Sequence, residues 1–271
     1  MAKVTNNFVP KNTAIEALNP MTKILAIFSL GLGSLIFPNS WLGIVIIIGL
    51  FFVAAMAKML VPFAKMIFGF GIPITVMLMF IQGCYSPKNE TVIFDLGFAK
   101  FCEEGALYAL KIITTLLVFL GTFYIMNKTT YTGKLVAALT ASGLNPKAGY
   151  LVLASLNVVP QMQRRMSVIQ EAQSARGVET GGSLSGRIKA FIPLLGPVVM
   201  SSLTDAQERG MTLETRGFGI KNVKQTTYVE VTKSQADKIL KVLLITFFVV
   251  VLILTILMKL NICLLYTSPS P

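Results

Sequence analysis

Two short arginine–glycine cassettes are the residues of this chain best suited to binding a partner. The first cassette is Ser174-Ala175-Arg176-Gly177, and the second cassette is Thr215-Arg216-Gly217-Phe218. An arginine in the last turn of a helix complements the helix dipole, and a following glycine can adopt the left-handed conformation that ends the helix. An arginine held at a helix tip can also form bidentate hydrogen bonds with carboxylates of another protein. Helix capping and partner docking therefore both stay open as interpretations.

Outside the cassettes, no arrangement of residues indicates catalysis or a bound cofactor. The chain has no histidine, which removes the commonest proton shuttle and metal ligand. Its three cysteines, Cys84, Cys102 and Cys263, are too few and too scattered for a zinc site. Residues 181–187 have arginine where a phosphate-binding loop needs lysine, so we expect a turn there. We expect no catalytic residue, no metal site and no cofactor, and we predict that the chain is not itself an enzyme.

The composition indicates an all-α integral membrane protein. Of the 271 residues, 54% are hydrophobic and only 13% are charged, whereas about a quarter of a soluble domain is charged. A spanning helix needs roughly 20 apolar residues. Five apolar runs come near this length, although the first is short: residues 24–37, 41–57, 66–83, 105–126 and 239–258. We therefore predict about five transmembrane helices.

The distribution of lysine and arginine predicts how these helices are oriented. Residues 127–241 carry fifteen Lys/Arg against seven Asp/Glu, and Lys3, Lys11 and Lys23 precede the first apolar run. The loop of residues 85–104 has two lysines against four acidic residues. Because positive loops stay on the cytoplasmic side, we expect the N-terminus and the long basic stretch to be cytoplasmic and the C-terminus to lie outside. Cys84 and Cys102 would share the outer side and could pair. We expect a multi-pass protein of the cell membrane.

The basic stretch between the fourth and fifth apolar runs predicts a pair of long helices. Apolar residues recur every three or four positions after Pro160, which is the period of an amphipathic helix, until the first cassette ends the pattern. A second helix is expected to begin near Arg187 and to end at the second cassette. The strongly apolar residues 148–159 fit a re-entrant helix, an interfacial helix or the membrane end of a longer helix. A polar linker, residues 219–232, follows the second helix.

These patterns divide the chain into four parts. Residues 1–126 form an N-terminal part with four membrane helices, residues 127–238 form the cytoplasmic or interfacial region of the two long helices, and residues 239–260 form the last membrane helix. Residues 261–271 are predicted to be a non-native or disordered tail, because the sequence from Leu264 onward has no helical pattern.

Three short motifs occur together in this order. They are Leu18-Asn19-Pro20-Met21-Thr22-Lys23, Gln173-Ser174-Ala175-Arg176-Gly177 and Leu213-Glu214-Thr215-Arg216-Gly217-Phe218. Together they resemble the transmembrane T component of energy-coupling factor (ECF) transporters, micronutrient importers related to ABC importers. The resemblance extends to about Lys259. The chain departs from the family pattern at Asn19, Met21 and Thr215, where the family has Asp, Arg and Ala.

The resemblance implies a coupling role. In this family two cytoplasmic helices cross, and the signature arginines dock in grooves of two ATP-binding subunits. If the family's pattern applies to this chain, Arg176 would dock on one ATP-binding cassette ATPase subunit and Arg216 on the other. Those subunits would perform the ATP hydrolysis. Their motion would be transmitted to a separate substrate-binding membrane subunit that selects a vitamin or a transition metal.

A group of methionines supplies a candidate surface for that substrate-binding subunit: Met162, Met166, Met200 and Met211. Methionine side chains are flexible and suit a surface that receives exchangeable partners. The alternative is that these residues only pack the two long helices against each other.

Two alternatives to a shared vitamin-import module remain. The chain could be the dedicated subunit of a cobalt or nickel system, which the sequence does not distinguish. It could also be a membrane-anchored interaction protein whose basic insert binds anionic lipid or nucleic acid. Acidic residues such as Glu171, Asp205 and Glu214 interrupt the basic residues of the insert, so we expect no nucleic acid as a partner. The expected partners are the lipid bilayer, two ATPase subunits and a substrate-binding membrane subunit.

Overall fold

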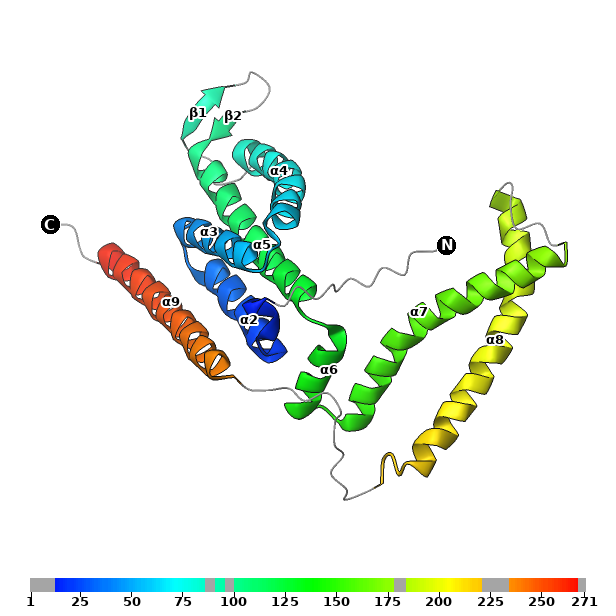
Figure 1. The fold of residues 1–271 in the computed structure, drawn as a ribbon. Coiled ribbons are helices and arrows are strands. Elements are labelled where there is room, and N and C mark those ends of the chain that lie inside the picture. The colour runs from blue at the N-terminus through cyan, green and yellow to red at the C-terminus, as the bar shows by residue number, and fades with distance from the viewer. Residues whose placement is uncertain (1–12, 86–90, 96–99, 178–183, 221–233, 268–271) are drawn as a thin grey trace. The chain divides into compact units, whose positions relative to one another are not determined.

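Helices make up most of the residues that the structure describes (Figure 1). The computed structural model describes residues 13–85, 91–95, 100–177, 184–220 and 234–267. The all-α membrane fold is therefore confirmed, with one small β-hairpin in addition. The chain divides into two compact units. We call residues 7–135 and 231–271 the bundle unit and residues 1–6 and 136–230 the hairpin unit.

Among the described residues, three helices of the bundle unit are long and apolar enough to cross a membrane. They are α4 (Leu60–Tyr85), α5 (Glu103–Thr129) and α9 (Gln235–Thr267). Two further apolar helices are shorter, α2 (Pro20–Ile36) with 17 residues and α3 (Trp41–Met56) with 16. At 1.5 Å per residue, these two helices are about 25 Å long, slightly less than the hydrocarbon core of a bilayer. That α2 and α3 also span the membrane therefore stays a prediction.

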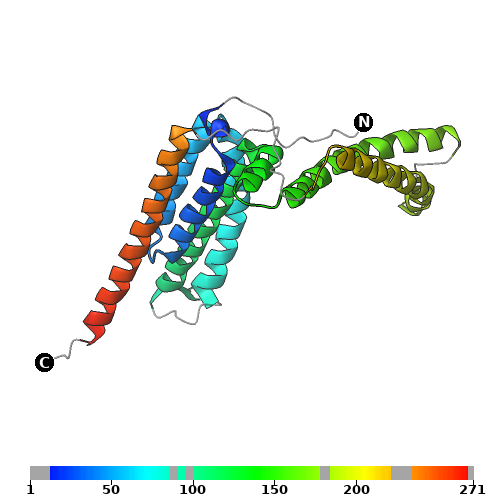
Figure 2. The ribbon, with the colours of Figure 1, turned by 90° about the horizontal axis from the view of Figure 1, so that it is seen from below.

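Helix α5 is the centre of the bundle unit, where it packs against α2, α3 and α4. The axes of α2, α4, α5 and α9 run roughly parallel in Figure 2. Phe63 of α4 is completely buried, and its ring meets the edge of Phe51 with ring centroids 5.1 Å apart. Small residues permit close helix contact: a Cβ added at Gly43 would lie 2.8 Å from Cβ of Thr114 on α5.

A β-hairpin lies between α4 and α5, where the sequence predicted only a loop. Strand β1 (Val92–Asp95) pairs antiparallel with β2 (Lys100–Cys102). Cys102 is buried and Cys84 is partly exposed, and no disulfide bond joins them. The disulfide that the sequence allowed between these two cysteines is therefore not formed in this structure.

A buried carboxylate joins the N-terminal ends of α2 and α9. Asp237 is 2% exposed, and its Oδ1 accepts a hydrogen bond from the backbone N–H of Asn19 at 2.8 Å and one from the Thr22 hydroxyl at 3.4 Å. Its Oδ2 accepts from the backbone N–H of Ser234 at 3.1 Å. Helix N-termini favour a negative charge, so one carboxylate stabilises two helices at once. The Asn19 side chain in turn accepts from the backbone N–H of Met21 at 3.0 Å, as a capping aspartate would.

A buried lysine forms hydrogen bonds with the C-terminal end of α5. The ammonium group of Lys23 donates to the Thr129 carbonyl oxygen at 2.9 Å, to the Thr129 hydroxyl at 3.1 Å and to the Thr130 hydroxyl at 3.0 Å. A cation is favourable at this end of a helix, because the carbonyl groups of the last turn have no intrahelical partner. The motif Leu18-Asn19-Pro20-Met21-Thr22-Lys23 thus joins three helices of the bundle unit, namely α2, α5 and α9.

The hairpin unit contains two long helices, α7 (Pro146–Ala175) and α8 (Leu184–Thr215). A shorter helix, α6 (Thr132–Ala141), precedes them and lies across the boundary between the units in sequence. Helix α7 is continuous through Pro160, so the apolar residues 148–159 are the first half of a longer helix. Of the three interpretations offered by the sequence, the structure therefore supports a longer helix, and the place of its first half at the membrane stays a prediction. Helix α8 begins one turn before the expected start near Arg187.

Polar side chains hold α7 and α8 together. Arg165 forms an ion pair with Asp205 and donates to the Ser201 hydroxyl at 2.6 Å. Farther along the pair, Arg209 donates to the Gln161 side-chain oxygen at 2.6 Å. Gln161 of α7 contacts Arg209 of α8, whereas Arg165, one turn later in α7, contacts Asp205, one turn earlier in α8. The two helices are therefore antiparallel.

Three predicted features fall partly outside the described residues. Helix α9 continues to Thr267, so it extends into the segment from Leu264 onward, where no helix was expected. The final residues, 268–271, lie outside the description. The same holds for residues 181–183 of the expected turn and for 221–232 of the polar linker.

Candidate functional site

The first cassette forms the C-terminal end of α7. Arg176 is the C-cap residue, and its backbone N–H donates to the Gln173 carbonyl at 3.1 Å. Gly177 follows with φ +85° and donates to the Ser174 carbonyl at 3.0 Å. All four residues from Ser174 to Gly177 are exposed, and a Cβ added at Gly177 would have no atom of the described residues within 4 Å. The arginine is therefore presented at an open helix tip.

The second cassette ends α8 in a complete Schellman motif. The backbone N–H of Gly217 donates to the Glu214 carbonyl, and that of Phe218 donates to the Leu213 carbonyl, each at 2.9 Å. Gly217 has φ +69°, which a residue with a side chain rarely adopts. Arg216 and Thr215 are exposed. The sequence prediction that a glycine ends each long helix is correct for both cassettes.

Residues just after Arg216 fold back onto the beginning of α7. The ring of Phe218 packs against the ring of Tyr150, with centroids 5.0 Å apart. Gly219, at φ +85°, lies so close to Lys147 that an added Cβ would be 2.8 Å from the lysine Cε. The second cassette is thereby fixed against the other long helix.

The antiparallel pairing places the two cassettes at opposite ends of the helix pair. Arg176 ends α7, whereas Arg216 ends α8 beside the residues that begin α7. Helix α7 has 30 residues, so at 1.5 Å per residue its two ends are about 45 Å apart along the axis. One groove on a partner could not receive both arginines. The arrangement suits two separate docking sites.

The four candidate methionines do not share one environment. Met162 and Met166 are half-buried, and the Met162 sulfur accepts a hydrogen bond from the Ser202 hydroxyl of α8 at 3.5 Å. Met162 therefore contributes to packing between the two helices. Met200 is 66% exposed and Met211 is 60% exposed, so both are available to a partner.

Exposed apolar stripes lie on both long helices, and of these the sequence indicated only the apolar character of residues 148–159. On α8 the stripe repeats every three or four residues: Ile192, Leu195, Val199 and Leu203. On α7 a shorter stripe repeats in the same way: Val152, Leu156 and Val159. Soluble monomers rarely expose contiguous apolar patches, so stripes of this kind mark contact with a protein or a membrane. Their helical spacing is the signal that could have identified them.

A comparison with protein families matches most of the chain. The profile of the family described as cobalt transport protein, CbiQ, matches residues 11–228, which include both cassettes. The chain belongs to the CbiQ cobalt transport protein family. Both cassettes and the motif that includes Lys23 lie in the part shared with other CbiQ proteins.

Individual relatives of this CbiQ protein carry one common name, energy-coupling factor transporter transmembrane protein EcfT. The protein from Bacillus subtilis is 25% identical over 79% of this chain and 84% of its own length. The one from Leuconostoc gelidum is 29% identical over 90% of this chain and 93% of its own length. The one from Listeria innocua is 27% identical over 79% of this chain and 84% of its own length. These relatives confirm the resemblance to the T component of ECF transporters.

Some residues of the site in this CbiQ protein were not recognised from the sequence. Tyr150 contacts Phe218 of the second cassette and Lys147 contacts Gly219 just after it, and both lie about 70 positions earlier in the chain. Gly219 carried a signal, because a second glycine two positions after Gly217 indicates another residue with positive φ. Among the described residues, no group of His, Cys, Asp or Glu could hold a metal ion.

Proposed function

We propose that this chain is the transmembrane coupling component of an ECF-type importer. It binds two ATP-binding cassette ATPase subunits through its two cassettes and transmits their motion to a separate substrate-binding membrane subunit. The observation that carries this proposal is the presence of two exposed arginines at opposite ends of one antiparallel helix pair. The EcfT names of its relatives agree with it.

The geometry of the cassettes supports one arginine per ATPase. Arg176 and Arg216 each stand at a helix end whose glycine leaves the backbone open to close approach. A guanidinium group at such a tip can bind a carboxylate in a groove by two parallel hydrogen bonds. Because the helix pair links the two tips, movement of either ATPase would reach the whole pair.

The apolar stripes support a membrane subunit as the third partner. The α8 stripe, together with Met200, forms one exposed apolar surface on a helix that also carries charged residues. The adaptable methionine side chain at this surface suits partners that are exchanged. Met162 and Met166 would support the surface from between the helices, and Met211 would extend it toward the second cassette.

Cargo selection and ATP hydrolysis are assigned to the partners in this proposal. The sequence contains no phosphate-binding loop of the kind an ATPase needs. The cargo would be a vitamin or a transition metal recognised by the substrate-binding subunit. The excess of basic residues in 127–241 supports placement of the long helices in the cytoplasm of a multi-pass protein of the cell membrane.

Co-purification tests the docking role directly. The double variant Arg176→Glu with Arg216→Glu should insert into the membrane like the unmodified chain but should lose both ATPase subunits in detergent. Each reversal replaces the attraction between the arginine and a carboxylate of the ATPase with a repulsion. In a close ion pair this change costs about 2–5 kcal/mol of binding free energy.

A matched control separates docking from total charge. Arg164→Glu with Lys238→Glu changes the net charge equally, and both of these side chains are exposed outside the cassettes. This control should keep both ATPase subunits. Undiminished recovery of both subunits with the cassette double variant would contradict the proposal.

A further inference from the structure

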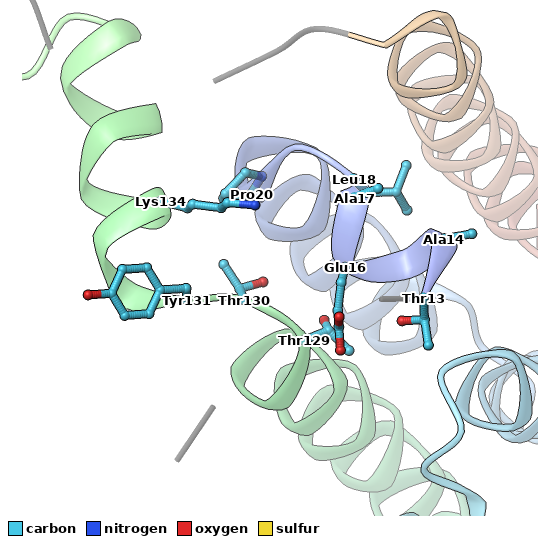
Figure 3. A pocket seen from close by; sticks show the side chains of 10 residues that line it. All are labelled: Thr13, Ala14, Glu16, Ala17, Leu18, Pro20, Thr129, Thr130, Tyr131 and Lys134. Carbon is cyan, nitrogen blue, oxygen red and sulfur yellow. The ribbon is translucent and has the colours of Figure 1, made fainter. Parts of the chain in front are cut away.

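A cavity of about 460 Å³ lies in the bundle unit beside α1 (Ala14–Ala17), and the proposed coupling function does not use it (Figure 3). One wall comes from α1 and the beginning of α2, and the other comes from the junction of α5 and α6. It is lined by Thr13, Ala14, Glu16, Ala17, Leu18, Pro20, Thr129, Thr130, Tyr131 and Lys134. The cavity thus combines a cation, an anion and several hydroxyl groups from two distant parts of the chain.

Thr13 gives the first sign that this cavity receives a ligand. Its side chain is only 7% exposed, and its hydroxyl has no hydrogen-bond partner among the described residues. It precedes α1 without capping that helix. Buried hydroxyl groups in folded proteins are nearly always hydrogen-bonded. A ligand in the cavity that Thr13 lines would supply the partner that the described residues do not.

Thr130 offers a second hydroxyl on the opposite wall. Its oxygen accepts a hydrogen bond from the Lys23 ammonium at 3.0 Å. Its own hydrogen has no acceptor among the described residues, whereas the neighbouring Thr129 hydroxyl already donates to the Ile125 carbonyl at 2.7 Å. With the ammonium group of Lys134, this wall can present a hydroxyl donor and a cation to an oxyanion, whereas Thr13 lies on the other side of Glu16 (Figure 3).

Glu16 adds the opposite charge to the same cavity. Its carboxylate has two oxygens and about four acceptor positions, so it can bind an ammonium group in addition to its partner within the chain. Lys134 and Glu16 balance each other, which makes the lining neutral overall. A ligand that is itself zwitterionic matches this lining better than a simple anion does.

The place of the cavity in the fold identifies the source of such a ligand. Apolar helix α2 begins at Pro20 and apolar helix α5 ends at Thr129, and both residues line the cavity. The cavity is therefore level with the ends of membrane-type helices, where phospholipid headgroups lie. Ala14, Ala17 and Leu18 supply an apolar side to the same opening.

We propose that this cavity binds the headgroup of a zwitterionic phospholipid with a primary ammonium group, of the phosphatidylethanolamine class. The phosphodiester lies against Lys134 and the Thr130 hydroxyl, and the ammonium group lies between Glu16 and the hydroxyl oxygen of Thr13 (Figure 3). The site is independent of the two cassettes, so its test does not depend on ATPase docking.

Lipid exchange into nanodiscs that contain the full chain tests this site. Phosphatidylethanolamine should bind more tightly than phosphatidylcholine, whose quaternary ammonium donates no hydrogen bond, and more tightly than phosphatidylglycerol, which has no ammonium. Lys134→Gln should weaken phosphatidylethanolamine binding at least about tenfold, because it removes a charge-assisted hydrogen bond. Thr13→Val should weaken it at least about fivefold, because the ammonium group loses one hydrogen-bond acceptor.

The same variants distinguish ligand binding from a structural role. Thr13→Val should raise the thermal unfolding temperature of the lipid-depleted chain, since it removes a buried hydroxyl without a partner. Glu16→Gln should abolish the preference for phosphatidylethanolamine over phosphatidylglycerol. Lys65→Gln, which removes an exposed lysine from α4, should change neither quantity.

Three outcomes would overturn the proposal. Equal phosphatidylethanolamine binding by the unmodified chain and by Thr13→Val and Lys134→Gln would mean that the cavity holds only water. A loss with Lys65→Gln as large as with Lys134→Gln would indicate general attraction to charged surfaces. Competition by soluble phosphoethanolamine at the same concentration as the lipid would identify a free zwitterion as the ligand.

Discussion

The two cassettes share a sequence pattern but differ in what holds them. At the second cassette, Phe218 packs on Tyr150, and Gly219 lies against Lys147. At the first cassette, every residue from Ser174 to Gly177 is exposed, and no atom of the described residues lies within 4 Å of the Cβ position of Gly177. Arg216 therefore lies on a turn that is held by contacts with α7, which we call the brace, whereas Arg176 lies on an exposed helix end.

This difference has an energetic consequence for docking. A binding segment that is already ordered loses less conformational entropy when it meets its partner. The contacts of Phe218 and Gly219 supply that order before any ATPase is present. If both arginines make similar contacts with the ATPases, the second cassette should therefore contribute more net affinity than the first.

Single charge reversals have the largest expected effects, because each costs about 2–5 kcal/mol of docking free energy, and the difference between them tests this inequality. Arg216→Glu should weaken binding of the ATPase pair about fivefold more than Arg176→Glu does, which corresponds to the cost of ordering one or two side chains. The dissociation constant can be measured by titrating both ATPase subunits onto the chain in nanodiscs. Arg164→Glu, an exposed reversal within α7, serves as the control and should leave affinity unchanged. Equal losses from Arg176→Glu and Arg216→Glu would show that bracing does not affect docking.

Removal of the contact between Tyr150 and Phe218, which is part of the brace, gives the next largest effect. Tyr150→Ala deletes the ring beneath Phe218, and an aromatic pair contributes about 0.5–1.5 kcal/mol beyond its buried area. We expect hydrogen exchange of the Gly217 and Phe218 amides to accelerate roughly tenfold, since 1.4 kcal/mol corresponds to a factor of ten. Exchange at the end of α7 near Arg176 should not change.

Tyr150→Phe provides a matched control for the brace. It keeps the ring and removes only the hydroxyl, so protection of the second cassette should stay as in the unmodified chain. If Tyr150→Ala also leaves that protection intact, the Schellman motif alone holds the second cassette, and the contrast with the first cassette is smaller than the contacts suggest.

The sequence predicted those features that depend on local chemistry. Both helix ends at Arg176 and Arg216 were found because glycine favours positive φ, and the structure has φ +85° at Gly177 and +69° at Gly217. The continuity of α7 through Pro160 was left open, because the pattern changes there from wholly apolar to amphipathic. The β-hairpin was missed, since strands of four and three residues leave almost no periodic signal.

Features that depend on long-range contacts could not be predicted. Asn19 and Asp237 are 218 positions apart, and no local pattern indicates that one carboxylate joins their two helices. The brace of the second cassette is of the same kind, because Tyr150 and Phe218 meet only once α7 and α8 pair antiparallel. The sequence thus located both arginines but gave no reason to treat the two cassettes as unequal.

The difference between substitutions of the two cassette glycines is the smallest expected effect, and it tests whether the bracing reaches the helix ends themselves. Gly177→Ala places a side chain at φ +85° in open space, so its cost is backbone strain alone, about 1–2 kcal/mol. Gly217→Ala adds a Cβ 2.9 Å from the flexible end of Ile220, which can move aside. Both variants should therefore loosen the last helical turn by a similar amount, measurable as faster amide exchange there.

Gly210→Ala within α8, where nothing lies within 4 Å, should have the opposite sign and stabilise the helix by about 1 kcal/mol. A much larger cost at Gly217 than at Gly177 would mean that Ile220 is held as firmly as Phe218, so that the braced region extends past the cassette.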